Sequence, residues 1–109
     1  MLKKDERTID AYMKAGAEMR LFKTLGTKLY VDISRVISAS DRQKLARVLG
    51  RVEEICSRAE DNMFRDHPGL SAEYIDVFYG CTGNDPRNDI DRKVIAMARE
   101  AADGLFEGT

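Results

Sequence analysis

The chain has 109 residues, 43% of them hydrophobic and 34% charged, with a formal net charge of −1. A chain of this length predicts a single domain, 1–109, that buries a core without disulfide or metal staples. It has no run of about 20 apolar residues, which excludes a membrane span, and its charged first residues are not followed by the apolar run of a signal peptide. We therefore expect a cytoplasmic protein in which Cys56 and Cys81 are reduced thiols.

Charge is distributed unevenly along the chain. Residues 20–58 contain nine basic and four acidic residues, a net of +5, whereas residues 59–109 contain five basic and eleven acidic residues, a net of −6. Two halves of opposite charge attract each other in a folded protein, or each faces a partner of the opposite sign. The sequence leaves both interpretations open.

The first predicted helix covers about residues 5–25, where apolar residues recur at helical spacing. Gly26 is predicted either to end this helix, with a second one over residues 27–37, or to kink a single longer helix. Gly16 lies on the apolar side, where a residue without a Cβ lets another helix approach, including that of a second copy. The apolar residues of this side are Ile9, Tyr12, Met13 and Met19.

The longest and most regular helical pattern runs from about residue 41 to residue 65, and we predict that it is the central helix of the fold. Ser40 is its expected N-cap, with Gln43 as the second half of a capping box. The helix must end before Pro68, because the residue ahead of a proline is disfavoured in the helical conformation. Its apolar stripe consists of Leu45, Val48, Leu49, Val52, Ile55, Cys56, Ala59 and Met63.

Two further helices are expected in the C-terminal part of the chain. Ser71 is placed to cap a short helix that ends near Tyr79 and contributes Phe78 to the core. Residues 81–84 are turn-forming, and Pro86 is expected at the first position of the last helix. No segment shows the alternation of a strand, so the sequence predicts an all-α domain of four to five helices around the central one.

One segment of the central helix matches a known DNA-binding pattern. The run QKLARVLG at residues 43–50, followed by Ser57, Arg58 and Glu60, resembles the helix-turn-helix of phage-repressor-like regulators. The resemblance implies a DNA-binding transcriptional regulator, with a turn after Gly50 and a recognition helix beyond it. The residues that would contact nucleic acid are Gln43, Lys44, Arg47, Arg51, Ser57 and Arg58.

The residues after Gly50 favour a different structure. At the positions where the motif has an apolar residue and then a capping Ser, Thr or Asn, this chain has Arg51 and Val52. A charged side chain does not fill a buried turn position, and valine cannot cap a helix. The apolar stripe crosses Gly50 unchanged, and one glycine costs a helix only about 1 kcal/mol. We therefore predict one continuous helix, with a basic ridge along one flank. The ridge consists of Lys44, Arg47, Arg51 and Arg58.

The sequence predicts no enzyme, cofactor or metal site. Cys56, His67 and Cys81 have the wrong spacing for a zinc site, and Cys56 lies on the apolar stripe as a core residue would. Cys81, with His67 as its only available imidazole, is the one candidate for a reactive thiol. Aspartates cluster at residues 85–91, but the central glycine and closing glutamate of a calcium loop are absent.

These observations favour a non-enzymatic helical interaction module, a small regulator or inhibitor of bacterial or phage type that binds a larger protein. Its acidic C-terminal half would bind the basic channel of a nucleic-acid enzyme by imitating phosphates. The expected acidic contacts are Asp76, Asp85, Asp89 and Asp91. The alternative is the DNA-binding regulator, which would bind nucleic acid through the basic segment 20–58.

Overall fold

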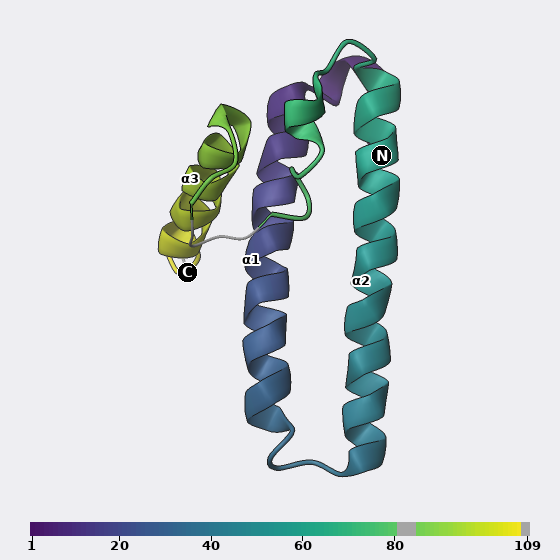
Figure 1. The fold of residues 1–109 in the computed structure, drawn as a ribbon, viewed down its shortest axis with the longest axis vertical. Helices are drawn as coiled ribbons and strands as arrows, with labels where there is room; N and C mark the ends of the chain where they lie inside the picture. The colour runs from purple at the N-terminus through teal and green to yellow at the C-terminus, as the bar shows by residue number, and fades with distance from the viewer. Residues whose placement is uncertain (81–84, 108–109) are drawn as a thin grey trace.

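A computed structural model describes residues 1–80 and 85–107, which form an all-helical protein (Figure 1). Its α-helices are α1 (Ile9–Ile33), α2 (Ala39–Asp66) and α3 (Asp89–Gly104), with short 3-10 turns at Lys4–Glu6 and Ala72–Tyr74. The predicted all-α class is confirmed, and these described residues contain no strand. The predicted number of four to five helices is wrong, because two expected helices are joined in α1 and a third is reduced to a 3-10 turn.

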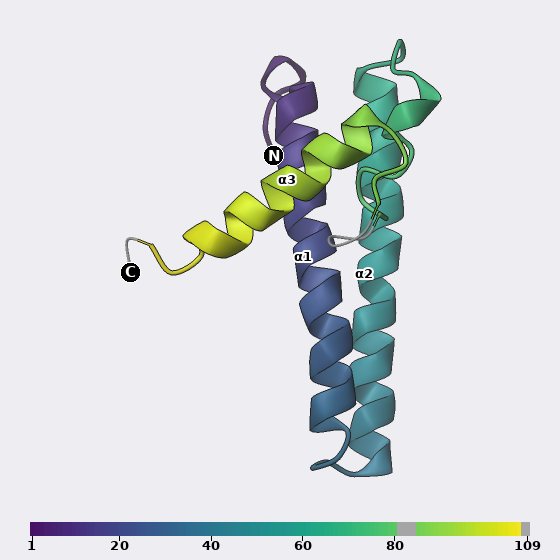
Figure 2. The ribbon, with the colours of Figure 1, turned by 60° about the vertical axis from the view of Figure 1, so that its left-hand side comes forward.

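The two long helices form an antiparallel hairpin, and α3 crosses one half of it (Figures 1 and 2). This half holds the start of α1 and the end of α2, and we call it the base. The other end, where residues 34–38 connect α1 to α2, extends beyond α3, and we call it the tip. The molecule is accordingly elongated, with extents of 47 × 31 × 27 Å.

α1 is a single helix through Gly26. Thr8 caps its start, with its hydroxyl accepting a hydrogen bond from a backbone N–H of the first turn at 3.1 Å. Gly26 is buried, and a Cβ at this position would lie 3.1 Å from a methyl carbon of Leu49 in α2. The glycine lets the two helices approach closely, and their packing outweighs the roughly 1 kcal/mol that glycine costs a helix. Two separate helices on either side of Gly26 are therefore wrong, and the alternative of one longer helix holds.

α2 confirms the continuous central helix. It starts before the expected residue, because the hydroxyl of Ser38, rather than that of Ser40, accepts the capping hydrogen bond, from the N–H of Asp41 at 3.1 Å. The helix then runs without interruption through Gly50 to Asp66. A helix-turn-helix needs a turn after Gly50, so the DNA-binding geometry implied by the resemblance is not formed by this segment.

The short helix expected after Ser71 is wrong in extent. Ser71 does accept a capping hydrogen bond from a backbone N–H at 3.3 Å, but the helical part is only Ala72–Tyr74. The backbone carbonyls of Val77 and Phe78 accept hydrogen bonds from side chains of α1 instead of continuing a helix. The chain is thereby drawn against α1.

α3 begins later than expected. The side-chain oxygen of Asn88 accepts a hydrogen bond from the N–H of Asp91 at 2.8 Å, which makes Asn88 the N-cap. Pro86 therefore lies in the connection before the helix and not at its first position. The turn expected at residues 81–84 lies outside the described residues.

The core lies at the base of the hairpin, where the three helices and the segment around Phe78 meet. Cys56 and Phe78 are buried there, as expected from the sequence, whereas Tyr79 is 37% exposed. α1 contributes no core residue after Ala17 and α2 none before Cys56, so the tip has no share in the core. The core residues are Met13, Ala17, Cys56, Met63, Val77, Phe78, Val94 and Ala98.

Gly50 provides a direct test of the continuous helix. It is exposed within α2, and a Cβ at this position would meet no atom within 4 Å. We expect Gly50→Ala to raise the free energy of unfolding by about 0.5–1 kcal/mol, because alanine restricts the unfolded chain and needs no additional room in the folded one. Urea denaturation followed by circular dichroism measures the change. A loss of stability would contradict the continuity of α2.

Candidate protein-binding face

A buried ion pair fixes α3 against α1. Arg20, only 1% exposed, donates hydrogen bonds to the carbonyl oxygen of Val77 at 2.9 Å and to the carboxylate of Asp91 at 2.7 Å. It also donates to the carbonyl oxygen of Asp76. Gly80 leaves room for this guanidinium group, since a Cβ there would lie 2.5 Å from its central carbon. Arg20 thus joins α1, the segment before α3, and α3 itself.

Two of the four aspartates expected to bind a partner are engaged within the protein. Asp91 is 5% exposed, and besides Arg20 it accepts a hydrogen bond from the backbone N–H of Arg87 at 2.9 Å. Burial alone would raise the pKa of Asp91, but the hydrogen bonds from Arg87 and Arg20 hold the pKa below its ordinary value. Asp76 forms a 2.6 Å ion pair with the side chain of Arg87. The structure therefore removes Asp91 from the predicted contact set, because its carboxylate is used inside the fold.

The other two aspartates are at the surface. Asp85 and Asp89 are exposed, and the carboxylate of Asp89 lies 3.0 Å from a nitrogen of Arg92 in the next turn of α3. The predicted set thus consists of one buried residue, one partly buried residue paired with the exposed Arg87, and two exposed residues, of which Asp89 is paired with Arg92. It does not provide four free carboxylates for a basic partner.

The residues predicted as the alternative nucleic-acid contact are all exposed on α2. The four basic ones form the predicted ridge, because their spacing places them along one side of the continuous helix. Lys44 lies 3.9 Å from Asp41, while the ion pairs found in residues 1–80 and 85–107 do not include the three arginines of the ridge. The exposed residues are Gln43, Lys44, Arg47, Arg51, Ser57 and Arg58.

Part of the basic segment 20–58 is used internally. Lys23 donates a hydrogen bond to the carbonyl oxygen of Phe78 at 2.7 Å, lies 3.5 Å from Glu53, and stands 4.8 Å from the centre of the Tyr79 ring. Together with the buried pair of Arg20 and Asp91, these contacts tie the basic half of the chain to the acidic half. Among the ion pairs of the described residues, only that of Arg20 with Asp91 joins the basic half to the acidic half, so attraction between the halves accounts for a single pair of opposite charges.

A cluster of polar side chains holds the N-terminal segment to the end of α2. Arg7 donates two hydrogen bonds to the carboxylate of Asp66, at 2.6 and 3.1 Å, and the hydroxyl of Tyr12 donates a third at 2.5 Å. These hydrogen bonds from Arg7 and Tyr12 hold the pKa of Asp66 far below its usual range. A ring nitrogen of His67 lies 2.7 Å from the carbonyl oxygen of Arg7, and the rings of His67 and Tyr12 meet edge to face. His67 thus belongs to a structural cluster.

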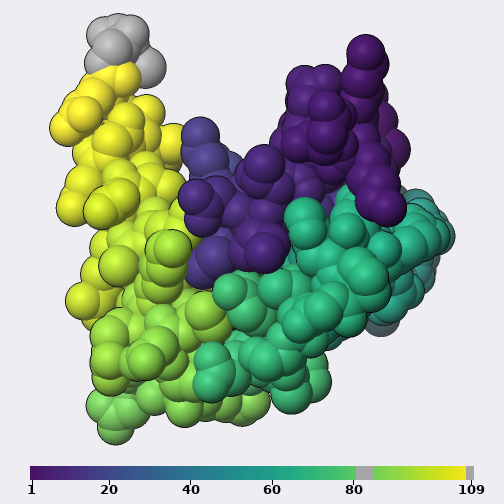
Figure 3. Space-filling model, turned by 90° about the horizontal axis from the view of Figure 1, so that it is seen from above, coloured from purple at the N-terminus to yellow at the C-terminus, as the bar shows by residue number. Residues whose placement is uncertain are grey.

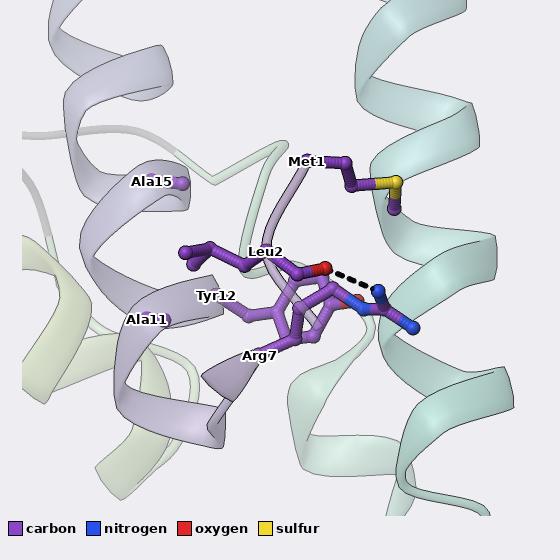
Figure 4. A pocket seen from close by; sticks show the side chains of 6 residues that line it. All are labelled: Met1, Leu2, Arg7, Ala11, Tyr12 and Ala15. Carbon is purple, nitrogen blue, oxygen red and sulfur yellow. Dashed lines mark hydrogen bonds between the residues drawn. The ribbon is translucent and has the colours of Figure 1, made fainter. Parts of the chain in front are cut away.

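This cluster places the first residues beside α1. Arg7 donates a hydrogen bond to the carbonyl oxygen of Leu2 at 2.7 Å, and the Leu2 side chain extends toward Ala11 and Ala15 (Figure 4). Together with Met1, these residues line a shallow apolar hollow of about 220 Å³. The N-terminal segment therefore extends the apolar surface of α1.

The hollow is one end of a longer apolar surface, which we call the α1 face. Phe22, Leu25 and Leu29 are 51%, 60% and 46% exposed, although each has a large apolar side chain. Adjoining hollows share Ala15, Glu18 and Phe22, so the surface continues from the N-terminal segment to Leu25. The α1 face consists of Ala11, Ala15, Glu18, Phe22, Leu25 and Leu29.

Neighbouring helices form the sides of the α1 face. Val52 and Ile55 of α2 line one hollow on it, and Ala101 and Leu105 at the end of α3 line another. Figure 3 shows a recess between the N-terminal segment and the end of α3, with α1 at its floor. Ile55 and Leu105 are themselves more than half exposed. A contiguous apolar surface of this kind is an interaction site more often than the rest of a protein surface is.

The residues weighed for chemistry are structural where they are described. Cys56 is fully buried, and this burial raises the pKa of its thiol, so the thiol stays protonated and unreactive near neutral pH. Cys81, the expected reactive thiol, lies outside the described residues. Within the part of the chain that the structure describes, no three side chains of His, Cys, Asp or Glu lie close enough to hold a metal ion.

Neither Arg20 nor the α1 face is among the site residues predicted from the sequence. In the sequence Arg20 is simply one of the basic residues of segment 20–58, and no pattern indicates that it is buried. The α1 face does leave a signal: its residues are separated by alternating steps of four and three, which is the heptad spacing of an apolar seam. The side of α1 that contains Met13 and Gly16, offered by the sequence as a surface for another helix, is instead buried within the fold.

Comparison of this chain with protein-family models, with curated proteins and with solved structures gives no match. The fold and the site therefore define only a structural class. It is an all-α protein in which a long helical hairpin leaves one apolar helix face exposed. No helix in the described residues has the length and apolar character needed to span a membrane.

Proposed function

We propose that this protein is a non-enzymatic helical interaction module, a regulator or inhibitor that acts by binding a larger protein. The observation that carries the proposal is the α1 face, where Phe22, Leu25 and Leu29 are about half exposed in one line along a helix. Fully burying a large apolar side chain contributes about 1.5–3 kcal/mol, so covering this line is favourable. A helix of another polypeptide, laid along α1, would cover it.

The proposed contact differs from the acidic surface favoured by the sequence alone. Asp91 is buried against Arg20, Asp76 is paired with Arg87 and Asp89 is paired with Arg92, so three of the four residues of the acidic contact set already have partners within the chain. The apolar side chains of the α1 face have no such cover. Apolar burial also provides affinity more directly than exposed charges do, because surface ion pairs contribute only about 0–1 kcal/mol.

A second candidate function is binding of nucleic acid by the basic ridge of α2. The exposure of Arg47, Arg51 and Arg58 favours it, although α2 supplies no helix-turn-helix. Binding of this kind would weaken steeply with salt, because each phosphate contact releases counterions. Contact through the α1 face would depend much less on salt, since it rests on apolar burial.

We expect a photo-crosslinking amino acid at position 25 to form covalent protein adducts in the cells that encode the chain, because a bound helix would cover the Leu25 side chain. The matched control is the same amino acid at position 47, where Arg47 is equally helical and exposed but lies on the basic ridge. Mass spectrometry of the adducts identifies the bound polypeptide.

The two positions distinguish the two candidate functions. Protein adducts that form at position 25 and not at position 47 would support the proposal. Nucleic-acid adducts at position 47, with no protein adduct at position 25, would overturn it in favour of the second candidate.

A further inference from the structure

We infer that the α1 face binds a second copy of this chain, with the two α1 helices packed antiparallel. The inference rests on the proposed function for the role of the α1 face in binding a helix, but it names a second copy, and not a larger protein, as the polypeptide that covers the face in the purified chain. Two hairpins joined along α1 would form a four-helix bundle. In this bundle the contact between the copies would cover the part of α1 toward the tip, which α3 leaves exposed (Figure 2).

The spacing along α1 fits a helical partner. Ala15, Phe22 and Leu29 occupy one heptad position, and Glu18, Leu25 and Asp32 occupy the position three residues later. From Ala11 to Asp32 the pattern covers about three heptads, in which five of the seven seam positions are apolar and Glu18 and Asp32 are acidic. α1 thus presents a second apolar stripe, on a different side from the one that packs Met13 and Ala17 into the core.

An antiparallel register aligns this seam with itself. A two-fold axis at the level of Lys23 and Thr24 places Phe22 opposite Leu25 of the second copy and Leu29 opposite Glu18, each contact occurring twice. The largest apolar side chains of the face then meet at the centre of the interface, where burial is most complete.

Charges that flank the seam support the same register. It brings Lys28 of one copy beside Glu18 of the other, and Lys14 beside Asp32. Lys28 and Asp32 already form a 2.6 Å ion pair within α1, so each end of the interface would gain a network of opposite charges. Glu18 and Asp32, the two acidic residues within the seam, would each have a lysine of the second copy next to them.

A parallel arrangement lacks this complementarity. It would place Glu18 beside Glu18 and Lys14 beside Lys14, and like charges at an interface are unfavourable. The antiparallel arrangement also brings the tip of one copy to the base of the other. The exposed Ile55 of α2 and Leu105, the residue directly after α3, border the face and would widen the contact.

The test begins with the mass of the purified full-length chain in solution, measured by sedimentation equilibrium. We expect a reversible dimer, and Phe22→Glu to raise its dissociation constant at least about tenfold, because a charge replaces the central apolar contact. Phe22 is exposed, so the variant should keep the fold, which circular dichroism verifies.

Charge reversal then tests the register. Glu18→Lys and Lys28→Glu should each raise the dissociation constant about fivefold or more at low salt, because each creates two like-charge contacts per dimer. The double variant restores the opposite charges between copies, but not the pairing within each helix, and should return the constant to near the original value. The matched controls, Glu54→Lys and Arg47→Glu on α2, lie off the α1 face and should change little.

A chain that stays monomeric up to millimolar concentration would overturn the inference. So would a dimer that tolerates Phe22→Glu, or one in which the double charge reversal is no better than the single ones. A monomer whose position 25 still forms adducts with another protein would refute the second copy as the occupant and leave the proposed function standing.

Discussion

Replacing Arg20 by Met should lower the free energy of unfolding by about 3–5 kcal/mol, which is the usual cost of removing one partner of a buried ion pair. The substitution would leave the carboxylate of Asp91 buried without its cation and the carbonyl oxygen of Val77 without its donor. Because Arg20 joins α1 to α3, the loss should also loosen the docking of α3. Urea denaturation followed by circular dichroism measures the change.

An exposed ion pair provides the matched control. Asp89 and Arg92 of α3 are 3.0 Å apart, but both side chains are more than half exposed. We expect Arg92→Met to change the stability by no more than about 0.5 kcal/mol, since exposed pairs contribute little. If Arg20→Met costs as little as Arg92→Met, the Arg20–Asp91 pair does not hold α3 in place.

Replacing Gly16 by Ala should lower the free energy of unfolding by about 1–3 kcal/mol, the usual cost of overpacking a core. A Cβ at this position would lie 2.5 Å from a methyl carbon of Val77 and 2.6 Å from its carbonyl oxygen. That oxygen cannot easily retreat, because it accepts the hydrogen bond from Arg20. The segment before α3 would have to move away from α1.

The same substitution at Gly50 is the internal comparison for Gly16→Ala. Both glycines lie within helices, so helix propensity favours alanine equally at both positions. Only Gly16 faces another segment at close range. Opposite signs of the two stability changes in urea melts would show that close approach, and not helix propensity, requires Gly16. A gain at both positions would contradict the tight packing of Val77 on α1.

The existence and course of the helices are easier to predict from the sequence than the residues at which they begin and end. The apolar stripe of α2 keeps its phase across Gly50, and the helix is continuous there. Its start is less predictable, because Ser38 and Ser40 are both good capping residues and lie two positions apart. The short helix after Ser71 is overestimated for a different reason, since the carbonyls of the segment that follows bind side chains from α1.

The contacts between distant segments are much harder to predict. Arg20 and Asp91 are 71 positions apart, and each lies in an amphipathic helix where a charged residue is expected to face solvent. The opposite charges of the two halves suggest attraction without indicating which residues meet. Asp91 therefore resembles a surface contact in the sequence and is an internal one in the fold.

The α1 face shows the same difficulty in another form. α1 carries two apolar stripes, one that includes Met13 and one that includes Phe22. Both have helical spacing, so the pattern alone does not indicate which is buried. The choice is made by the docking of α3 and of the segment around Val77, which depends on packing far along the chain.

Because α3 covers only the base, the hairpin does not resist opening equally along its length. Separating α1 from α2 at the tip breaks contacts between these two helices alone, whereas separating them at the base also exposes the core and strips Arg20 of its partners. The free energy of local unfolding is therefore lowest beside the 34–38 connection and approaches the global value near Met13 and Met63. In an antiparallel dimer the stable base of each copy would pack against the less stable tip of the other. Association would therefore make the free energy of local unfolding more even along the hairpin.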